Sequence, residues 1–293
     1  MATTPLPTTA PWPAPAKINL FLHIVGRRPD GYHLLQTHFQ FLDHGDELRF
    51  AVRADGAIRR VTDLPGVPAE ADLVVRAAQA LQAASGCRLG ADIAVEKRLP
   101  MGGGLGGGSS NAATVLVALD RLWGTGLGVE ALASLGLTLG ADVPVFVRGE
   151  AAWAEGVGER LIPLAADEPW CVVIHPACEV PTAAVFKHPE LTRDTPAMTI
   201  PGLPPDLMHN DCEPVTRRLY PAVGAALDWL SGHAPARMSG TGACIFASFD
   251  TREAALTVGR LVPAPWSWFV ARRCNRSPLL ARLDAEPVRH PAR

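Results

Sequence analysis

The chain has 293 residues, of which 48% are hydrophobic and 19% are charged, and its net charge is −2 at pH 7. This composition excludes a disordered protein and allows either one large domain or two. The near-neutral charge gives no general attraction for nucleic acid or an anionic membrane surface, and no apolar run is as long as a membrane span. We therefore expect neither as a partner, and an anionic ligand would have to be held by local geometry.

The first residues are rich in proline, and the cysteines are scattered. Residues 1–16 hold five prolines and no charge, unlike a signal peptide with its basic segment and apolar core. We expect residues 1–14 to form a disordered tail. The absence of any C-x-x-C pair favours reduced thiols in a cytoplasmic protein and predicts no metal site. The cysteines are Cys87, Cys171, Cys178, Cys212, Cys244 and Cys274.

The segment from Ala16 to Val25 has the pattern of a β-strand. Lys17 and Asn19 are two residues apart, so their side chains point to the same side of the strand, roughly 7 Å apart along the backbone. A cation beside an amide suits a ligand with phosphate and hydroxyl groups, and a solvated strand face is the alternative. The Asp30-Gly31 turn predicts a hairpin to a second strand over residues 33–41.

Tyr32 and His33 follow that turn. An aromatic ring beside an imidazole can frame a planar ligand, and a packed core pair is the alternative. Further on, Asp72 and Gly86 have the residue types that begin and end a helix, so we expect a helix between them. Alternation over residues 91–97 predicts a strand that leads into a glycine-rich loop.

This glycine loop is the most informative feature of the chain. Six of the 27 glycines fall between residues 102 and 108, and an amphipathic helix is predicted over residues 111–123. Glycine lets backbone amides approach an anion closely, and a helix start adds partial positive charge, so the loop predicts a phosphate site. Its two serines are candidate N-caps whose hydroxyls could reach a phosphate or its metal ion. The loop reads Pro100-Met101-Gly102-Gly103-Gly104-Leu105-Gly106-Gly107-Gly108-Ser109-Ser110.

Known phosphate loops fit this run poorly. A P-loop needs a lysine where Ser109 stands. The dinucleotide pattern is met trivially in so many glycines, and Asp120 lies inside the predicted helix instead of ending a second strand. Protein-kinase signatures are absent. A flexible linker remains the alternative without a function. It is disfavoured because a predicted strand and a predicted helix flank the loop directly.

Asp142 lies in the run Gly-Ala-Asp-Val-Pro, after a helix predicted over residues 129–135 and before an apolar strand expected from Val145. An aspartate at such a junction is a candidate base, or else a cap or turn residue. A second glycine-rich turn, Arg237-Met238-Ser239-Gly240-Thr241-Gly242-Ala243, also runs into a strand. Two such loops favour a shared polyanionic ligand, and a tight β-turn is the alternative.

The second half of the chain mixes strands and helices without regular alternation. We expect strands at residues 171–175, 244–249 and 268–271, helices at 213–219 and 223–231, and a proline-rich loop at 191–205. This order predicts an α+β protein divided near residue 160.

Three motifs, taken together, resemble those of the galactokinase, homoserine, mevalonate and phosphomevalonate kinase superfamily. They are Pro15-Ala16-Lys17-Ile18-Asn19-Leu20, the glycine loop and the turn at residues 237–243. Three further runs resemble the branch that phosphorylates a cytidine-diphosphate-linked methylerythritol on the non-mevalonate route to isoprenoids. These runs are Arg28-Pro29-Asp30-Gly31-Tyr32-His33, residues 140–144, and His209-Asn210-Asp211-Cys212-Glu213-Pro214.

The resemblance covers residues 14 to 275 and implies a two-domain kinase. An ATP-binding domain would span residues 15–160 and a ferredoxin-like domain residues 161–293, with the active site between them. ATP would be used with Mg²⁺ held by phosphates and water. The enzyme would act on a small molecule as a monomer or weak homodimer. No role follows for the arginine-rich last twenty residues.

The resemblance also assigns roles to residues. Lys17 and Asp142 would be the catalytic pair, and residues 100–110 would hold ATP. The remaining matched positions would bind the substrate: Asn19, Tyr32, His33, Phe186, Gly240 and Thr241, with the aromatic residues and His33 on the cytosine. Two alternatives stay open, namely a kinase of the same superfamily acting on homoserine or a mevalonate, and an inactive nucleotide-binding regulator on the same fold.

Overall fold

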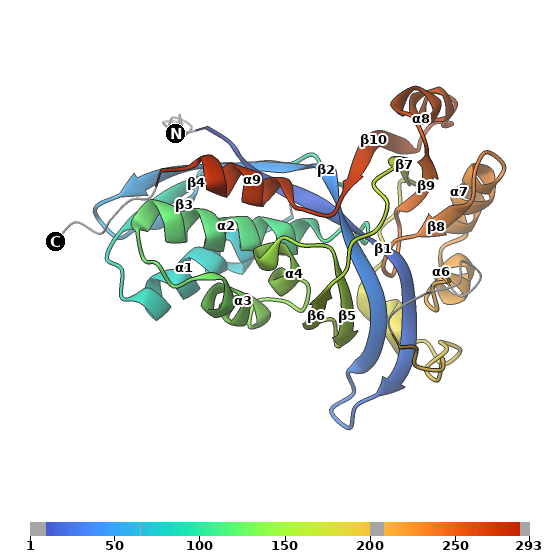
Figure 1. Cartoon of the computed structure of the whole chain (residues 1–293), viewed down its shortest axis with the longest axis horizontal. Coiled ribbons are helices and arrows are strands. Elements are labelled where there is room, and N and C mark those ends of the chain that lie inside the picture. Colours follow the sequence, from blue (N-terminus) through green and yellow to red (C-terminus); the bar gives the residue numbers. More distant parts are fainter. Residues whose placement is uncertain (1–9, 65, 200–207, 288–293) are drawn as a thin grey trace.

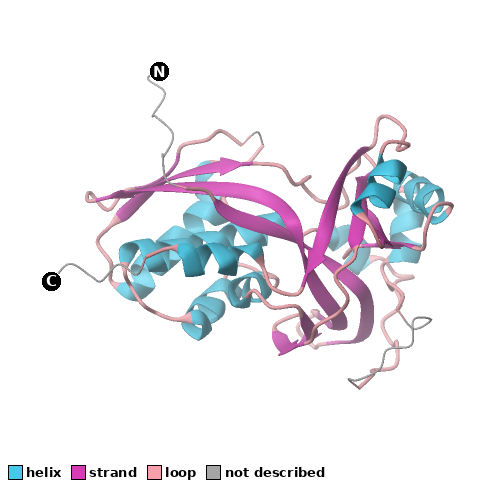
Figure 2. Ribbon diagram, turned by 45° about the horizontal axis from the view of Figure 1, so that its top comes forward, coloured by secondary structure: helices cyan, strands magenta, loops and turns pink. Residues whose placement is uncertain are grey.

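The computed structural model describes residues 10–64, 66–199 and 208–287, and it has two halves joined by long strands (Figure 1). The two longest strands, β1 (Trp12–Arg27) and β2 (His33–Arg53), form an antiparallel hairpin that extends from one half into the other (Figure 2). The predicted hairpin is confirmed, and both strands are longer than their alternating patterns indicated.

The first half combines the hairpin with a helical layer. Helix α2 packs against β1 and β2 and contacts α1 and α4, so its apolar residues lie in the main core. Strands β4 and β5 both pair with β2, and β3 pairs with β4. The elements are β3 (Ile58–Arg60), a 3-10 turn (Ala69–Ala71), α1 (Leu73–Ser85), β4 (Gly90–Glu96), α2 (Gly107–Trp123), α3 (Val129–Leu137), α4 (Val143–Arg148), β5 (Ala152–Gly156) and β6 (Arg160–Pro163).

The second half is ferredoxin-like, as the resemblance implied. Four strands lie in the order β10-β7-β9-β8, every neighbouring pair is antiparallel, and α7 and α8 pack on the sheet. The chain order of strand, helices, two strands, helix and strand is that of the ferredoxin-like fold. The elements are β7 (Trp170–His175), α5 (Thr182–Lys187), α6 (Glu213–Leu219), α7 (Pro221–Ser231), β8 (Ala236–Met238), β9 (Ile245–Phe249), α8 (Arg252–Gly259), β10 (Ser267–Cys274) and α9 (Pro278–Ala285).

Two chain segments differ from the sequence-based expectation near the ends. β1 begins at Trp12, so the part of the predicted tail from residue 12 to 14 is wrong, whereas residues 1–9 lie outside the described residues. The Trp12 ring is fully buried, with the Arg282 guanidinium 4.4 Å from its centroid. Arg282 belongs to α9, which packs against β1 and α2 of the first half. The domain boundary near residue 160 stays a prediction, and α9 lies beyond it in sequence.

Two local expectations were also wrong. Residues 143–148 form α4 instead of a strand, because Pro144 in the first turn is well suited to a helix start and all five apolar side chains of the segment are buried. The N-cap of α2 is Gly106 with a φ of +73°, not Ser109 or Ser110, and helical geometry begins at Gly107. By contrast, the predicted cap of α1 is confirmed, since the Asp72 side chain accepts a hydrogen bond from the Val74 amide.

Within the described ranges, no helix combines the length and apolar character needed to cross a membrane. All six cysteines are free thiols, and three of them are buried in the core.

Candidate active site

The two glycine-rich loops meet at the junction of the two halves. The carbonyls of Gly102 and Gly103 accept hydrogen bonds from the amides of Ala243 (3.2 Å) and Cys244 (3.0 Å). A Cβ at Gly104 would lie 2.2 Å from the Ser239 carbonyl oxygen, and the φ of Gly104 is +73°. Glycine is therefore required there by both space and backbone conformation. The first loop is thus braced by the second.

The first glycine loop leads directly into the first turn of α2. The Ser110 amide donates to the Gly106 carbonyl at 2.8 Å, which closes the first helical turn. The amides of residues 107–109 precede that bond, so the helix offers them without an intrahelical acceptor. Gly108 is exposed, Ser109 is partly buried and Ser110 is fully buried. A 17-residue helix that begins with accessible glycine amides is well suited to bind an anion.

Lys17 is buried beside this loop, with its side chain only 4% exposed. Its Nζ donates to Asn19 Oδ1 at 2.7 Å and to the Gly104 carbonyl at 3.0 Å, and it lies 3.5 Å from Asp142 Oδ2. An ammonium has three donors, so these three acceptors satisfy it despite its burial. The structure therefore brings Asp142 from a distant segment of the chain to the neighbouring side chains of Lys17 and Asn19.

The Asp142 carboxylate is not used as a helix cap. Asp142 is the N-cap residue of α4 by position, but its side chain makes no capping hydrogen bond. The carboxylate is 34% exposed and faces the Lys17 ammonium. The cap interpretation, which the sequence left open, is therefore not supported by the geometry.

The Asp46 carboxylate, which no sequence pattern predicted, binds the three residues that precede the glycine loop. Asp46 is fully buried, accepts the backbone amides of Arg98 (2.8 Å) and Leu99 (2.9 Å), and is paired with the Lys97 ammonium. These contacts attach the segment before Pro100 to β2. No local sequence signal marks Asp46, because its partners are about fifty residues away.

Asn19 of β1 and Asn210 of the segment before α6 both make hydrogen bonds to the second glycine loop. The Asn19 amide donates to Ser239 Oγ at 3.3 Å, and Asn210 Nδ2 donates to the carbonyls of Met238 (2.9 Å) and Gly240 (2.8 Å). The Thr241 hydroxyl lies 3.2 Å from that of Thr182 at the start of α5. Gly240 and Thr241 thus lie at the same junction as Lys17, whereas the bracing roles of Ser239 and Asn210 were not predicted.

A second cluster forms at the far end of the hairpin, where β2 begins. The rings of His33 and Phe186 have centroids 5.0 Å apart at an interplanar angle of 30°. Tyr32, at the tip of the same hairpin, is 63% exposed. Burial and the nearby cations of Arg193 and Arg27 lower the pKa of His33, so its imidazole is neutral at pH 7. Two of the three residues expected around a base are therefore in contact, and the third is exposed at the tip of the hairpin.

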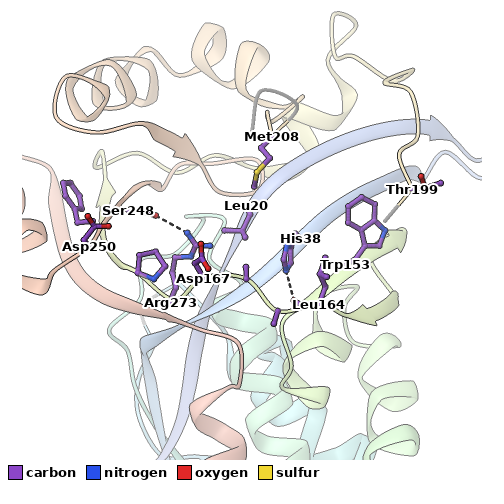
Figure 3. Close-up of a pocket in the computed structure, with 14 residues that line it drawn as sticks. Leu20, His38, Trp153, Leu164, Asp167, Thr199, Met208, Ser248, Asp250 and Arg273 are labelled. Atoms are coloured by element: carbon purple, nitrogen blue, oxygen red, sulfur yellow. Dashed lines mark hydrogen bonds between the residues drawn. The ribbon is translucent and has the colours of Figure 1, made fainter. Parts of the chain in front are cut away.

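A cavity of about 730 Å³ is drawn in Figure 3. It lies on the face of the β1–β2 hairpin opposite to the Lys17 side chain. It contains His38, whose side chain points away from that of its neighbour Phe39, and the Phe39 ring lies 5.3 Å from Lys17 Nζ. None of the predicted site residues is among its lining residues: Leu20, His38, Trp153, Leu164, Ala165, Ala166, Asp167, Pro169, Thr199, Met208, Ser248, Phe249, Asp250 and Arg273. This cavity is separate from the candidate active site.

The arrangement defines a class of protein. A glycine loop that feeds a helix, a buried lysine beside a partly exposed aspartate and a ferredoxin-like half are the features that the motif resemblance implied for a two-domain small-molecule kinase. Residues 72–150 match the family model described as GHMP kinases N terminal domain, and residues 201–267 match GHMP kinases C terminal. A crystal structure of mevalonate kinase, 13% identical, shares the fold with a TM-score of 0.65 over 92% of this chain and all of the other.

Relatives define the family more narrowly. A 4-diphosphocytidyl-2-C-methyl-D-erythritol kinase of Alkalilimnicola ehrlichii is 62% identical over 275 residues, which are 94% of each chain. One of Nitrosococcus oceani is 59% identical over 93% of this chain and 98% of its own. A crystal structure of a 4-(cytidine 5'-diphospho)-2C-methyl-D-erythritol kinase is 33% identical with a TM-score of 0.78, over 90% and 99% of the two chains. The chain belongs to the 4-diphosphocytidyl-2-C-methyl-D-erythritol kinase family.

Proposed function

We propose that this chain transfers the γ-phosphoryl group of ATP to the 2-hydroxyl of 4-diphosphocytidyl-2-C-methyl-D-erythritol, a step toward isoprenoid precursors. The observation that carries the proposal is the contact of Lys17 with both Asp142 and Gly104 at the glycine loop. The relatives' names supply the substrate. The His33–Phe186 pair supplies a site for the base of this substrate near the turn between β1 and β2.

Backbone groups carry out phosphate binding in this proposal. Loop residues 100–110 and the first turn of α2 present amides to the triphosphate, and the helix dipole adds to their attraction. The loop needs no lysine of the P-loop kind, because the anion is bound by amides and the ammonium of Lys17 is close by. The Asp46 contacts and the bracing second loop hold these amides in place before ATP arrives.

Lys17 and Asp142 divide the chemistry between them. Phosphoryl transfer passes through a loose transition state, so catalysis is mainly positioning and charge neutralisation. Lys17, fixed by Asn19 and Gly104, stabilises the negative charge that develops on the transferring group. Asp142 accepts the hydroxyl proton of the substrate as the new P–O bond forms. Its partial exposure leaves room for that hydroxyl.

Mg²⁺ accompanies the nucleotide in this proposal. Among residues 10–64, 66–199 and 208–287, no cluster of three or more acidic, histidine or cysteine side chains is placed to form a metal cage. The residues present fit an ion held mainly by phosphates and water, which would neutralise charge on the triphosphate. A monomer or weak homodimer in the cytoplasm stays our expectation.

An ADP-release assay with three acceptors tests the proposal. We expect turnover with the diphosphocytidyl methylerythritol and only background release with mevalonate or homoserine, because neither of the latter has a base to place at His33 and Phe186. Turnover with mevalonate or homoserine would favour another kinase of the superfamily. ADP release with none of the three, together with ATP binding, would favour an inactive regulator.

A further inference from the structure

Arg193 lies in the irregular segment after α5, and its guanidinium bonds two parts of the base-binding end together. Its Nε donates to His33 Nε2 at 3.1 Å. Its Nη2 donates to the carbonyls of Phe186 (3.1 Å) and His188 (2.7 Å), and its Nη1 donates to the Leu191 carbonyl at 2.9 Å. A planar guanidinium that is bonded along several edges has a fixed orientation.

These bonds join the start of β2 to the end of α5. His33 is the first residue of β2, and Phe186 lies in the last turn of α5, whose final carbonyls lack partners within the helix. Arg193 satisfies one such carbonyl and at the same time binds the ring that Phe186 faces. The 5.0 Å ring contact between His33 and Phe186 is therefore held at both sides by one side chain.

The hydrogen bond to His33 also fixes the position of its proton. A guanidinium can only donate, so Nε2 of His33 must accept the bond. A neutral imidazole that accepts at Nε2 carries its proton at Nδ1. The ring then presents a hydrogen-bond donor on the edge that Arg193 does not occupy. The edge of a cytosine offers acceptors, at O2 and N3, that such a donor can bind.

We propose that Arg193 is a positioning residue that fixes both the orientation and the Nδ1–H tautomer of His33, so that the site recognises an acceptor atom on the substrate's base. This inference rests on the proposed function. Arg193 itself need not touch the substrate. Its role concerns binding of the base and leaves the transfer step at Lys17 unaffected.

Protonation of His33 would undo this arrangement. A proton on Nε2 removes the acceptor and sets an imidazolium against the Arg193 guanidinium. Burial, followed by the charges of Arg193 and of Arg27 at the end of β1, lowers the pKa of His33 below its ordinary value. The neutral ring is therefore retained above this lowered pKa, and base recognition should weaken as the pH falls through it.

Two variants separate the charge of Arg193 from its geometry. Arg193→Gln removes both. Arg193→Lys keeps a cation near His33 but cannot make the set of hydrogen bonds that the planar guanidinium donates to His33 and the backbone carbonyls. We expect both to raise KM for the diphosphocytidyl substrate by about ten- to a hundredfold, with kcat and the KM for ATP within about twofold of the parent. Arg260→Gln, at an exposed site outside the cluster, is the matched control.

The pH profile gives a readout that a merely structural role would not move. In the parent, kcat/KM for the substrate should fall only at pH values below the ordinary range of histidine. In Arg193→Gln the midpoint should rise, since one cation no longer opposes protonation. In Arg193→Lys the midpoint should stay low although KM is raised. An unchanged midpoint in Arg193→Gln would overturn the inference.

Nitrogen NMR of the His33 ring tests the tautomer directly in the free protein, without any turnover. We expect a protonated Nδ1 and an unprotonated Nε2 in the parent, and loss of that bias in Arg193→Gln. A proton on Nε2 in the parent, or equal losses for ATP and the diphosphocytidyl substrate in the variants, would overturn the inference. Failure of the parent to turn over any diphosphocytidyl substrate would instead refute the proposed function.

Discussion

The Lys17 ammonium lies 3.5 Å from the Asp142 carboxylate, and the same nitrogen donates to the Gly104 carbonyl at 3.0 Å. One buried cation therefore contacts both the candidate base and the phosphate loop. Because Lys17 is fixed by Asn19 as well, its charge is positioned before the ligands bind, which is the arrangement that stabilises a transition state at least reorganisation.

Replacement of Asp142 tests the base. Asp142→Asn keeps the size of the side chain but removes its ability to accept a proton. We expect kcat to fall by about 10²–10⁴-fold with little change in the KM for ATP. Steady-state ADP release measures this, with Asp228→Asn, an exposed carboxylate on α7, as the control. A kcat within about threefold of the parent would refute the role of Asp142.

Replacement of Lys17 tests charge stabilisation. Lys17→Met retains an unbranched stem beside the Phe39 ring and removes the ammonium. We expect kcat to fall by about 10²–10³-fold, since the lost interaction is strongest in the transition state. Single-turnover kinetics at saturating ATP separate this step from binding. If only ATP affinity changed and the transfer rate at saturation were normal, Lys17 would be a binding residue alone.

Removal of the Phe186 ring tests the base site. Phe186→Ala deletes the ring that contacts His33, so we expect a higher KM for the diphosphocytidyl substrate and unchanged affinity for ATP. Isothermal titration with each ligand measures the two affinities separately. An equal loss for both ligands would show that the substitution disturbs the whole site, and the base assignment would fail.

A pair of glycine substitutions tests the bracing of the phosphate loop. Gly104→Ala introduces a methyl group 2.2 Å from the Ser239 carbonyl oxygen, whereas Gly126 has a similar φ of +64° and open space, with no atom within 4 Å of the position its methyl group would take. We expect Gly126→Ala to cost about 1–2 kcal/mol of stability from its backbone conformation alone. Gly104→Ala should cost more and should also raise the KM for ATP.

Chemical denaturation and ATP titration of the two glycine variants check this difference. Equal destabilisation, with normal ATP affinity in Gly104→Ala, would mean that the close approach of the two loops is not required. Because both variants share the positive φ, any excess effect at residue 104 comes from its close approach to the carbonyls of Ser239 and Gly242 in the second loop.

Local signals in the sequence predicted much of the fold. The cap of α1 at Asp72, the hairpin turn at Asp30-Gly31 and the strands of the second half follow from patterns that span a few residues. Errors arose where two local signals competed. The apolar run after Asp142 suits a strand or a helix, and Pro144 at its start together with burial on all sides decided for a helix. Trp12 lies in a proline-rich segment, and its burial depends on α9, near the other end of the chain.

In the candidate site, too, features with a local sequence signal were predicted and features that depend on distant contacts were not. Lys17 and Asn19 could be paired from their spacing. The pairing of Lys17 with Asp142 was implied only by the motif resemblance, and the hydrogen bond from Lys17 to the Gly104 carbonyl was not predicted. Asp46 and Arg193 carry no local signature, because each acts on backbone or side-chain groups brought to it by the fold. Residues that position others are therefore the ones that sequence patterns missed.

The most direct test of the central claim is the phosphorus NMR spectrum of the product formed from ATP and 4-diphosphocytidyl-2-C-methyl-D-erythritol. The 2-carbon bears no hydrogen, so a phosphate on its oxygen gives a monoester signal without three-bond coupling to a carbinol proton. We predict this uncoupled signal with the parent protein and its near-absence with Asp142→Asn. A proton-coupled monoester, or no new monoester while ATP is bound, would contradict the account.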